Sequence, residues 1–98
     1  MKHFLLELTY TAPLEQIEAS TPDHREYLQR AVDEGMLLLS GPQVPRVGGI
    51  IILRAQTMEE AQAFAEGDPF FTRNLVTPRL VEFRMVKRQA NLDAWVAE

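Results

Sequence analysis

The sequence predicts one α+β domain whose elements follow the order β-α-β-β-α-β. Two segments have the apolar periodicity of amphipathic helices, and four have the alternation or the β-branched content of strands. The chain has 98 residues, 46% of them apolar and 24% charged, which is the size and composition of a single globular domain. We therefore expect one domain over residues 1–98, with a core from 2 to 88 and a C-terminal tail from 89 to 98.

The N-terminal third predicts a strand followed by a helix. Residues 2–10 are expected to form the strand, because every second side chain from the fourth onward is apolar. Thr21 is a good N-cap and Pro22 suits the first helical position, so the helix is expected to begin at Thr21. Gly35 is expected to end it. Residues 13–19 are expected to form a short helical turn or a mobile loop.

The middle of the chain predicts two strands joined by a loop. Residues 36–39 form a short apolar run that is bounded by Ser-Gly-Pro at 40–42, and residues 43–49 contain turn-forming proline and glycine. Residues 50–53 are β-branched and apolar on both faces, which is typical of a central strand.

The C-terminal half predicts the second helix and the last strand. Thr57 and Glu60 make a capping box that opens a helix, and Gly67 is expected to end it. Residues 78–88 alternate again and are expected to form the fourth strand. The tail carries Trp95, which we interpret as a packing anchor.

This order of elements is that of the ferredoxin-like fold, an antiparallel four-stranded sheet with both helices on one face. The other face is then expected to show Leu5, Glu7, Leu80, Glu82 and Arg84. Such a face is too apolar to remain exposed and too charged for an ordinary core. It predicts a homodimer or a higher homo-oligomer that packs sheet against sheet and encloses a partly polar cavity.

Composition excludes several function classes. The net charge of −4 argues against a nucleic-acid partner, and the absence of cysteine excludes disulfides and thiolate metal sites. No apolar run is long enough to span a membrane, and the N-terminus lacks a signal-peptide core, so we expect a cytoplasmic protein. No His or carboxylate pair has metal-ligand spacing, and no glycine-rich phosphate loop is present. The sequence therefore predicts neither a metal nor a cofactor.

His24 and Asp68 are the candidate catalytic residues. His24 is expected on the inward side of the first helix near its start, where the helix dipole favours the neutral imidazole that accepts protons. Asp68 follows the second helix, and the antiparallel packing of the two helices allows the two side chains to meet. Each residue also has a structural interpretation. His24 can be a half-buried histidine bonded to the backbone, and Asp68 can cap the turn that Pro69 opens.

The candidate substrate-binding residues are Ser40, Gly41, Pro42 and Phe70. Gly41 would let a ligand approach the backbone, although Ser-Gly-Pro is more often plain turn punctuation. The second histidine, His3, is expected to be solvated at a sheet edge.

Several motifs in a fixed order resemble the YciI-like (YCII-related) family. They are Pro22-Asp23-His24-Arg25-Glu26-Tyr27-Leu28, Glu34-Gly35, Leu39-Ser40-Gly41-Pro42, Gly48-Gly49, Ala61-Gln62-Ala63-Phe64 and Asp68-Pro69-Phe70, and they cover roughly residues 2 to 88. The resemblance implies a ferredoxin-like fold that dimerises as an α+β barrel. It also implies a His–Asp pair in a cleft, formed here by His24 and Asp68, with the Gly-Pro turn beside it. One known member type removes chloride from a chlorinated hydroxyhydroquinone.

Two function classes remain open at this point. The first is a small enzyme that carries out acid–base chemistry on a small organic substrate by isomerisation, elimination (dehydrochlorination) or lactone chemistry, with His24 as base or acid and Asp68 orienting it. The second is a non-catalytic ligand-binding or assembly module in which the two residues only tie helices together. A cavity that is open to the pair favours the enzyme, and a pair sealed within the protein favours the module. A monooxygenase is weakened by the lack of a second histidine near the expected cavity.

Overall fold

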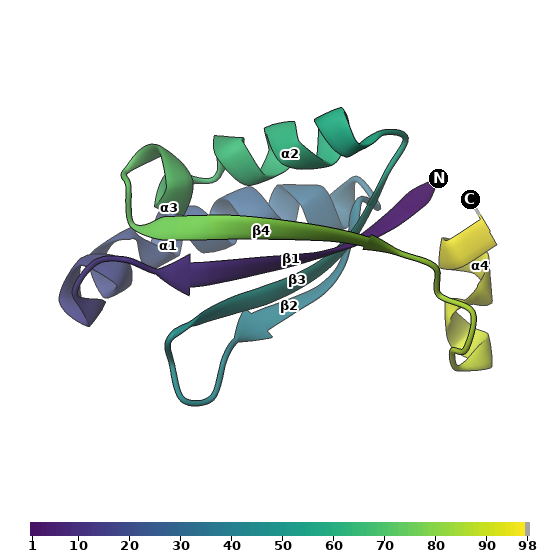
Figure 1. The fold of residues 1–98 in the computed structure, drawn as a ribbon, viewed down its shortest axis with the longest axis horizontal. Helices are drawn as coiled ribbons and strands as arrows, with labels where there is room; N and C mark the ends of the chain where they lie inside the picture. Colours follow the sequence, from purple (N-terminus) through teal and green to yellow (C-terminus); the bar gives the residue numbers. More distant parts are fainter. Residues whose placement is uncertain (98) are drawn as a thin grey trace.

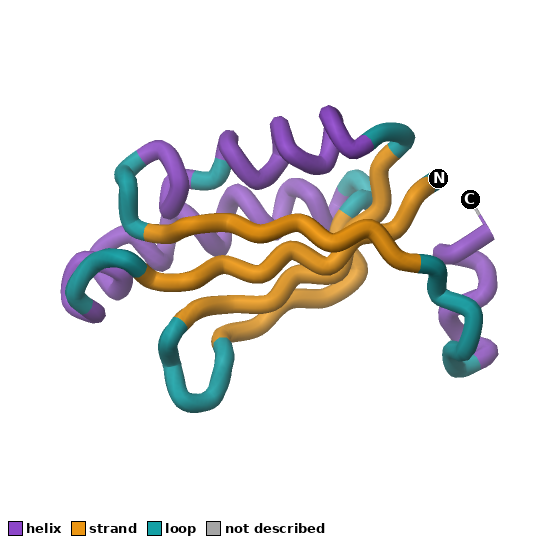
Figure 2. The backbone as a smooth tube through the Cα atoms, viewed as in Figure 1, coloured by secondary structure: helices purple, strands orange, loops and turns teal. Residues whose placement is uncertain are grey.

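The computed structural model describes residues 1–97 and forms an antiparallel four-stranded sheet with its long helices on one face (Figures 1 and 2). The sheet order is β2-β3-β1-β4, so the apolar segment at 50–53 lies in an inner strand, as its composition predicts. The elements are β1 (Lys2–Tyr10), α1 (Leu14–Asp33), β2 (Leu37–Pro42), β3 (Gly48–Ala55), α2 (Met58–Gly67), α3 (Pro69–Thr72), β4 (Val76–Phe83), a 3₁₀ turn (Ala90–Leu92) and α4 (Asp93–Ala97). The predicted ferredoxin-like α+β fold is confirmed.

Helix α1 begins seven residues before the predicted start, so the prediction of an N-cap at Thr21 is wrong. Pro22 lies inside the helix, where a proline costs about 3 kcal/mol because it removes a backbone donor and crowds the preceding turn. The first turns are held from elsewhere: Ile17 is fully buried in the core, and Arg73 of the α3–β4 connection donates to the buried Ser20 hydroxyl at 3.0 Å. Packing thus overrides the local start signal.

The end of α1 agrees with the prediction. Gly35 adopts φ +81°, a left-handed conformation that glycine reaches without strain. The backbone N–H of Gly35 donates to the carbonyl of Val32, and that of Met36 donates to the carbonyl of Ala31. This pair of bonds is the Schellman arrangement that closes a helix.

Strand register decides which side chains face the helices. Buried Phe4 and Leu6 of β1 lie opposite Glu82 and Leu80 of β4, so all four point toward the helix side. The prediction that Leu80 and Glu82 belong to the opposite face is therefore wrong, and Arg84 lies beyond the end of β4. In that prediction the side chains of β4 are assigned to the wrong faces of the sheet, because a shift of one residue in the pairing of β4 with β1 exchanges the two faces of the strand.

The face of the sheet away from the helices, called the open face below, is largely apolar. Leu5 lies between Ile52 of β3 and Val81 of β4, and Phe83 follows on β4. These side chains are only half-buried. Glu7 and Arg79 contribute an ion pair at 3.3 Å on the same face. The open face is thus more apolar than the mixed set that the sequence predicted.

Strand β2 continues through Ser40 and Gly41 to Pro42, so the three residues belong to a strand and not to a turn that bounds it. The pairing with β3 shifts between Leu37 and Leu39, as at a β-bulge. After the shift Ser40 lies opposite the buried Ile51, which turns its side chain toward the helix side.

The C-terminal tail folds back against one end of the sheet (Figure 1). Trp95 of α4 contacts the His3 ring at 5.4 Å between centroids and donates from Nε1 to the carbonyl of Gly35 at 3.0 Å. The Arg54 guanidinium lies 4.9 Å from the Trp95 ring. Trp95 is therefore a packing anchor, as predicted. His3 is buried beneath it, so the prediction of a solvated histidine is wrong.

Candidate active site

His24 and Asp68 are in direct contact, although they lie 44 positions apart in the chain. The Nδ1 atom of His24 lies 2.9 Å from Oδ1 and 2.8 Å from Oδ2 of Asp68. An ionised carboxylate only accepts hydrogen bonds, so Nδ1 carries the hydrogen in this pair. The contact has the length of a charge-assisted hydrogen bond.

The contact between His24 and Asp68 is the one that the sequence predicts, but the predicted position of His24 near the start of its helix is wrong. The residue lies ten positions after Leu14, in the middle of α1, and not at the helix N-terminus. The expected action of the helix dipole on His24 is therefore absent, because the dipole acts within the first and last turns. Asp68 is the partner that determines which ring nitrogen of His24 carries the hydrogen.

Asp68 is held at the junction of α2 and α3. It follows the last residue of α2 and caps α3, where its Oδ1 accepts from the backbone N–H of Phe70 at 2.9 Å. The carboxylate is 2% exposed, so it is almost sealed from water. The cap predicted from Asp-Pro-Phe and the contact with His24 are thus both present in one side chain.

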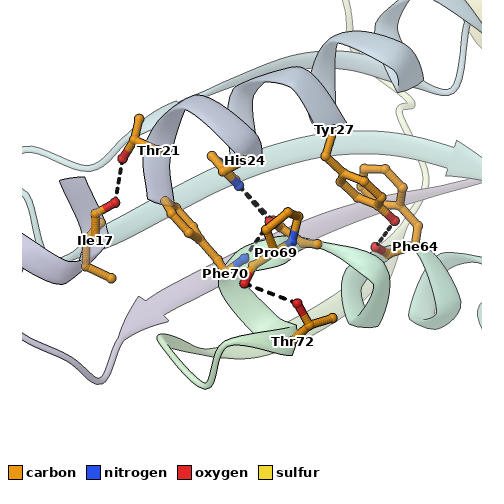
Figure 3. A network of polar contacts seen from close by, with 9 residues as sticks. Ile17, Thr21, His24, Tyr27, Phe64, Pro69, Phe70 and Thr72 are labelled. Carbon is orange, nitrogen blue, oxygen red and sulfur yellow. Dashed lines mark hydrogen bonds and ion pairs between the residues drawn. The ribbon is translucent and has the colours of Figure 1, made fainter. Parts of the chain in front are cut away.

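The chain immediately before Asp68 is fitted against α1. The hydroxyl of Tyr27 donates to the carbonyl of Phe64 at 2.7 Å, and the two rings stack at 5.1 Å (Figure 3). A Cβ atom on Gly67 would lie 2.5 Å from the Tyr27 hydroxyl oxygen, so a larger residue there would force the Tyr27 side chain to move. Burial raises the pKa of Tyr27, and the negative charge of Asp68 raises it further, which keeps the hydroxyl a donor at neutral pH.

Phe70 fixes the plane of the His24 ring. The two rings stack with centroids 3.9 Å apart and planes 7° apart, and Phe70 is 3% exposed. With Nδ1 bonded to Asp68, the imidazole cannot rotate without losing one of these contacts. Its other nitrogen, Nε2, has no hydrogen-bond partner among residues 1–97. The ring therefore presents one proton acceptor in a fixed direction.

A cavity of about 360 Å³ lies between α1 and the β2–β3 end of the sheet, and His24 lines it. All four predicted substrate-binding residues line it as well: Ser40, Gly41, Pro42 and Phe70. The remaining lining residues are Leu8, Tyr10, Thr21, Arg25, Leu28, Arg46, Gly49, Ile50 and Ile51. Leu8 and Ile51 line the cavity from the helix side of the sheet, and Ile50, which lies opposite Glu7, also contributes to its wall.

Sequence reasoning missed Tyr10, Arg25 and Arg46 as cavity residues. Arg46 reaches the site because the β2–β3 hairpin folds against the end of β1, where the Tyr10 N–H donates to the carbonyl of Val47 at 2.9 Å. Nothing in the local sequence pattern indicates this packing. Arg25 directly follows His24, but a helical neighbour points in another direction unless the cavity is wide.

Other kinds of site receive no support from the described residues. Within residues 1–97, no three His, Asp or Glu side chains converge as metal ligands. None of the helices in the same range combines the length and the apolar content that a membrane crossing requires. His3 does not line the cavity, which leaves His24 as the histidine there.

Comparison with known proteins now adds to this geometry. A family model of the YCII-related domain matches residues 1–84. The chain belongs to the YCII-related domain family. A solved structure with the same fold is 5-chloro-2-hydroxyhydroquinone dehydrochlorinase from Burkholderia phenoliruptrix AC1100, in complex with 2,5-dihydroxybenzoquinone. It has a TM-score of 0.73 and 19% sequence identity, and the match covers 91% of this chain and 97% of that chain. A search of functionally curated proteins found no match.

Proposed function

We propose that this YCII-related protein is a small enzyme that carries out acid–base chemistry on a small organic molecule, with no cofactor. The observation that carries the proposal is a histidine whose Nδ1 is 2.8 Å from a buried carboxylate and whose ring lines a cavity. A pair with only a structural role needs no opening to a cavity. The arrangement therefore supports the enzyme over the ligand-binding or assembly module.

In the proposed mechanism, Nε2 of His24 accepts a proton from a carbon or hydroxyl group of the substrate. Asp68 orients the ring and stabilises the imidazolium that forms. In an elimination, the electron pair left on the substrate expels a leaving group such as chloride from the neighbouring carbon. In an isomerisation, the same imidazolium returns the proton to another atom.

The Ser40 hydroxyl and the Gly41 backbone are proposed to hold a substrate oxygen on which negative charge develops. Their position in the cavity supports this role, since Ser40 is turned toward the helix side by the shift in β2. Phe70 is proposed to contact the substrate along the edge of its ring as well as to support His24. A dehydrochlorination is the reaction to test first, because a dehydrochlorinase shares the fold.

The test is a turnover screen with chlorinated hydroquinones and small lactones, followed by chloride release and by ultraviolet absorbance. His24→Ala is expected to abolish any turnover, because no other base replaces Nε2, while circular dichroism shows an unchanged fold. His3→Gln is the matched control, because it replaces the histidine outside the cavity. Turnover that survives in His24→Ala refutes the proposed mechanism.

We also propose that two copies of the cytoplasmic protein pack their open faces together. The half-buried apolar side chains Leu5, Ile52, Val81 and Phe83 support this, since a sheet face of this composition is costly to leave in water. Val81→Glu is expected to give a monomer, which light scattering at micromolar concentration would detect. A monomeric mass for the unchanged protein would contradict the dimer.

A further inference from the structure

The charged residues that line the cavity beside His24 are basic, whereas the whole chain is acidic. The protein has 14 acidic and 10 basic side chains, yet the described lining residues include Arg25 and Arg46 and no Asp or Glu. Asp68, the nearest carboxylate to His24, is sealed behind the ring and does not line the cavity. A concave site with cationic walls concentrates anions from solution.

Arg46 is held at the rim with part of its guanidinium unused. Its Nε donates to the Tyr10 hydroxyl at 3.4 Å, and its Nη1 lies 3.7 Å from a carboxylate oxygen of Glu18. The Nη2 atom makes no polar contact within residues 1–97. The pair with Glu18 is solvent-exposed, and such pairs contribute about 0–1 kcal/mol, so a bound anion can replace Glu18 at little cost.

Arg25 contributes a second guanidinium from α1. It is exposed and has no hydrogen bond or ion pair within the described residues. Arginine presents a planar set of donors that suits a carboxylate. The two guanidinium groups on this cavity therefore have N–H donors that no other described residue engages, and these are free to bind a ligand.

The cavity also limits the size and character of the ligand. Its volume of about 360 Å³ corresponds to about a dozen water molecules, which leaves room for on the order of ten non-hydrogen atoms. Away from the arginines it is lined by apolar side chains, namely Leu8, Leu28 and Ile51. A flat or compact apolar body with one acidic group matches this distribution.

We propose that the substrate is a small organic acid whose carboxylate is bound by Arg25 and Arg46, with its apolar body against Leu8 and Ile51. The inference rests on the proposed function, because it names the class of molecule that His24 acts on. Arg25 and Arg46 determine specificity and take no part in proton transfer. Tyr10 positions Arg46 by accepting from Nε.

The test measures binding and needs no turnover. Benzoate, 2-hydroxybenzoate and maleate are titrated at millimolar concentrations into the ¹⁵N-labelled protein, and backbone amide shifts are followed. Benzamide and 2-hydroxybenzamide are the neutral matches. The variants are Arg25→Gln and Arg46→Gln, and Arg30→Gln is the matched control, because Arg30 is an exposed arginine of the same helix that does not line the cavity.

The acids are expected to shift the backbone amide signals of the cavity residues. Benzamide and 2-hydroxybenzamide, which have the same shape but no charge, are expected to leave these signals unchanged. Each cavity variant is expected to weaken acid binding about tenfold, the effect of losing one hydrogen-bonded charge, while Arg30→Gln leaves it unchanged. Added salt is expected to weaken the binding of the acids. The proposal would be overturned if the acids and the neutral amides bound equally, or if no acid bound. It would also be overturned if Arg46→Gln bound the acids as tightly as the unchanged protein, or if the shifts were confined to residues outside the cavity.

The same variants separate this inference from the proposed function. In His24→Ala, the binding of the acids is expected to depend on Arg46 as it does in the unchanged protein, because both arginines remain. When carboxylate-bearing compounds are added to the turnover screen, Arg46→Gln is expected to raise KM for any of them that is turned over, with little change in kcat. If acid binding depends on Arg46 but turnover survives in His24→Ala, the proposed function is refuted. The inference about the class of ligand would still hold in that case.

Discussion

Asp68→Asn separates the two roles of this carboxylate. In the unchanged protein Oδ1 accepts from the Phe70 N–H at 2.9 Å while both oxygens face Nδ1 of His24. Asparagine has one oxygen and one NH₂ group, so only one of the two acceptor positions is kept, and an NH₂ donor replaces the other oxygen beside Nδ1. If its oxygen faced His24, the NH₂ would face the buried Phe70 N–H, which would leave that donor unpaired at a cost of about 1–3 kcal/mol. The oxygen is therefore expected to remain on Phe70.

The Asp68→Asn substitution is expected to change which nitrogen of the His24 imidazole carries the hydrogen. The NH₂ group then points at Nδ1, which must accept, so the hydrogen of the neutral ring moves to Nε2. A protonated Nε2 cannot take a proton from substrate. The expected loss of kcat is about two to four orders of magnitude, the range of a general base with the wrong tautomer. The free energy of unfolding is expected to fall by only about 1 kcal/mol, because asparagine caps α3 as well as aspartate does.

Two measurements check this prediction. The rate is determined with a substrate from the turnover screen, and the free energy of unfolding is determined by urea denaturation. Asp23→Asn is the control, since Asp23 is an exposed carboxylate of the same helix as His24 that pairs with Arg73 at 2.7 Å. A kcat for Asp68→Asn within about threefold of the unchanged value would show that Asp68 does not orient the base.

Two further predictions concern the fold. A Cβ atom on Gly48 would clash with the carbonyl oxygen of Leu8, which is backbone and cannot move aside. Gly48→Ala is therefore expected to lower the free energy of unfolding by about 3 kcal/mol or more in urea denaturation. Gly41→Ala is the control, because the space around its Cβ is open, and it should change the stability little. Burial, followed by the N-terminal charge, lowers the pKa of His3 below 6.5, so the unfolded chain binds a proton first as the pH falls. Stability is therefore expected to be lost as the pH falls below about 6.5, and His3→Gln should remove part of that loss; an identical pH dependence in the two proteins would refute it.

The sequence predicts the parts of the fold that local patterns control. The Schellman end at Gly35, the capping box at Thr57 and the Asp68 cap each depend on a few adjacent residues, and each is found. The start of α1 is different, because Thr21 and Pro22 give a strong local signal that the burial of Ile17 overrides.

The parts that the sequence did not predict depend on distant packing. The register of β4 against β1 places Leu80 with the core, and alternation alone cannot choose between the two faces of a strand. The burial of His3 depends on Trp95, far along the chain. The cavity arginine Arg46 depends on how the β2–β3 hairpin folds against β1. The His24–Asp68 contact was predictable because the helix arrangement and a family resemblance indicated the same two residues.

The central claim is that Asp68 holds the His24 ring with Nε2 as a free proton acceptor in the cavity. Long-range ¹H–¹⁵N correlation spectra of the imidazole, recorded at a pH where the ring is neutral, measure this directly. We expect a hydrogen on Nδ1 and an unprotonated Nε2 for His24, with the opposite tautomer in Asp68→Asn. A hydrogen on Nε2 of the unchanged protein would contradict it.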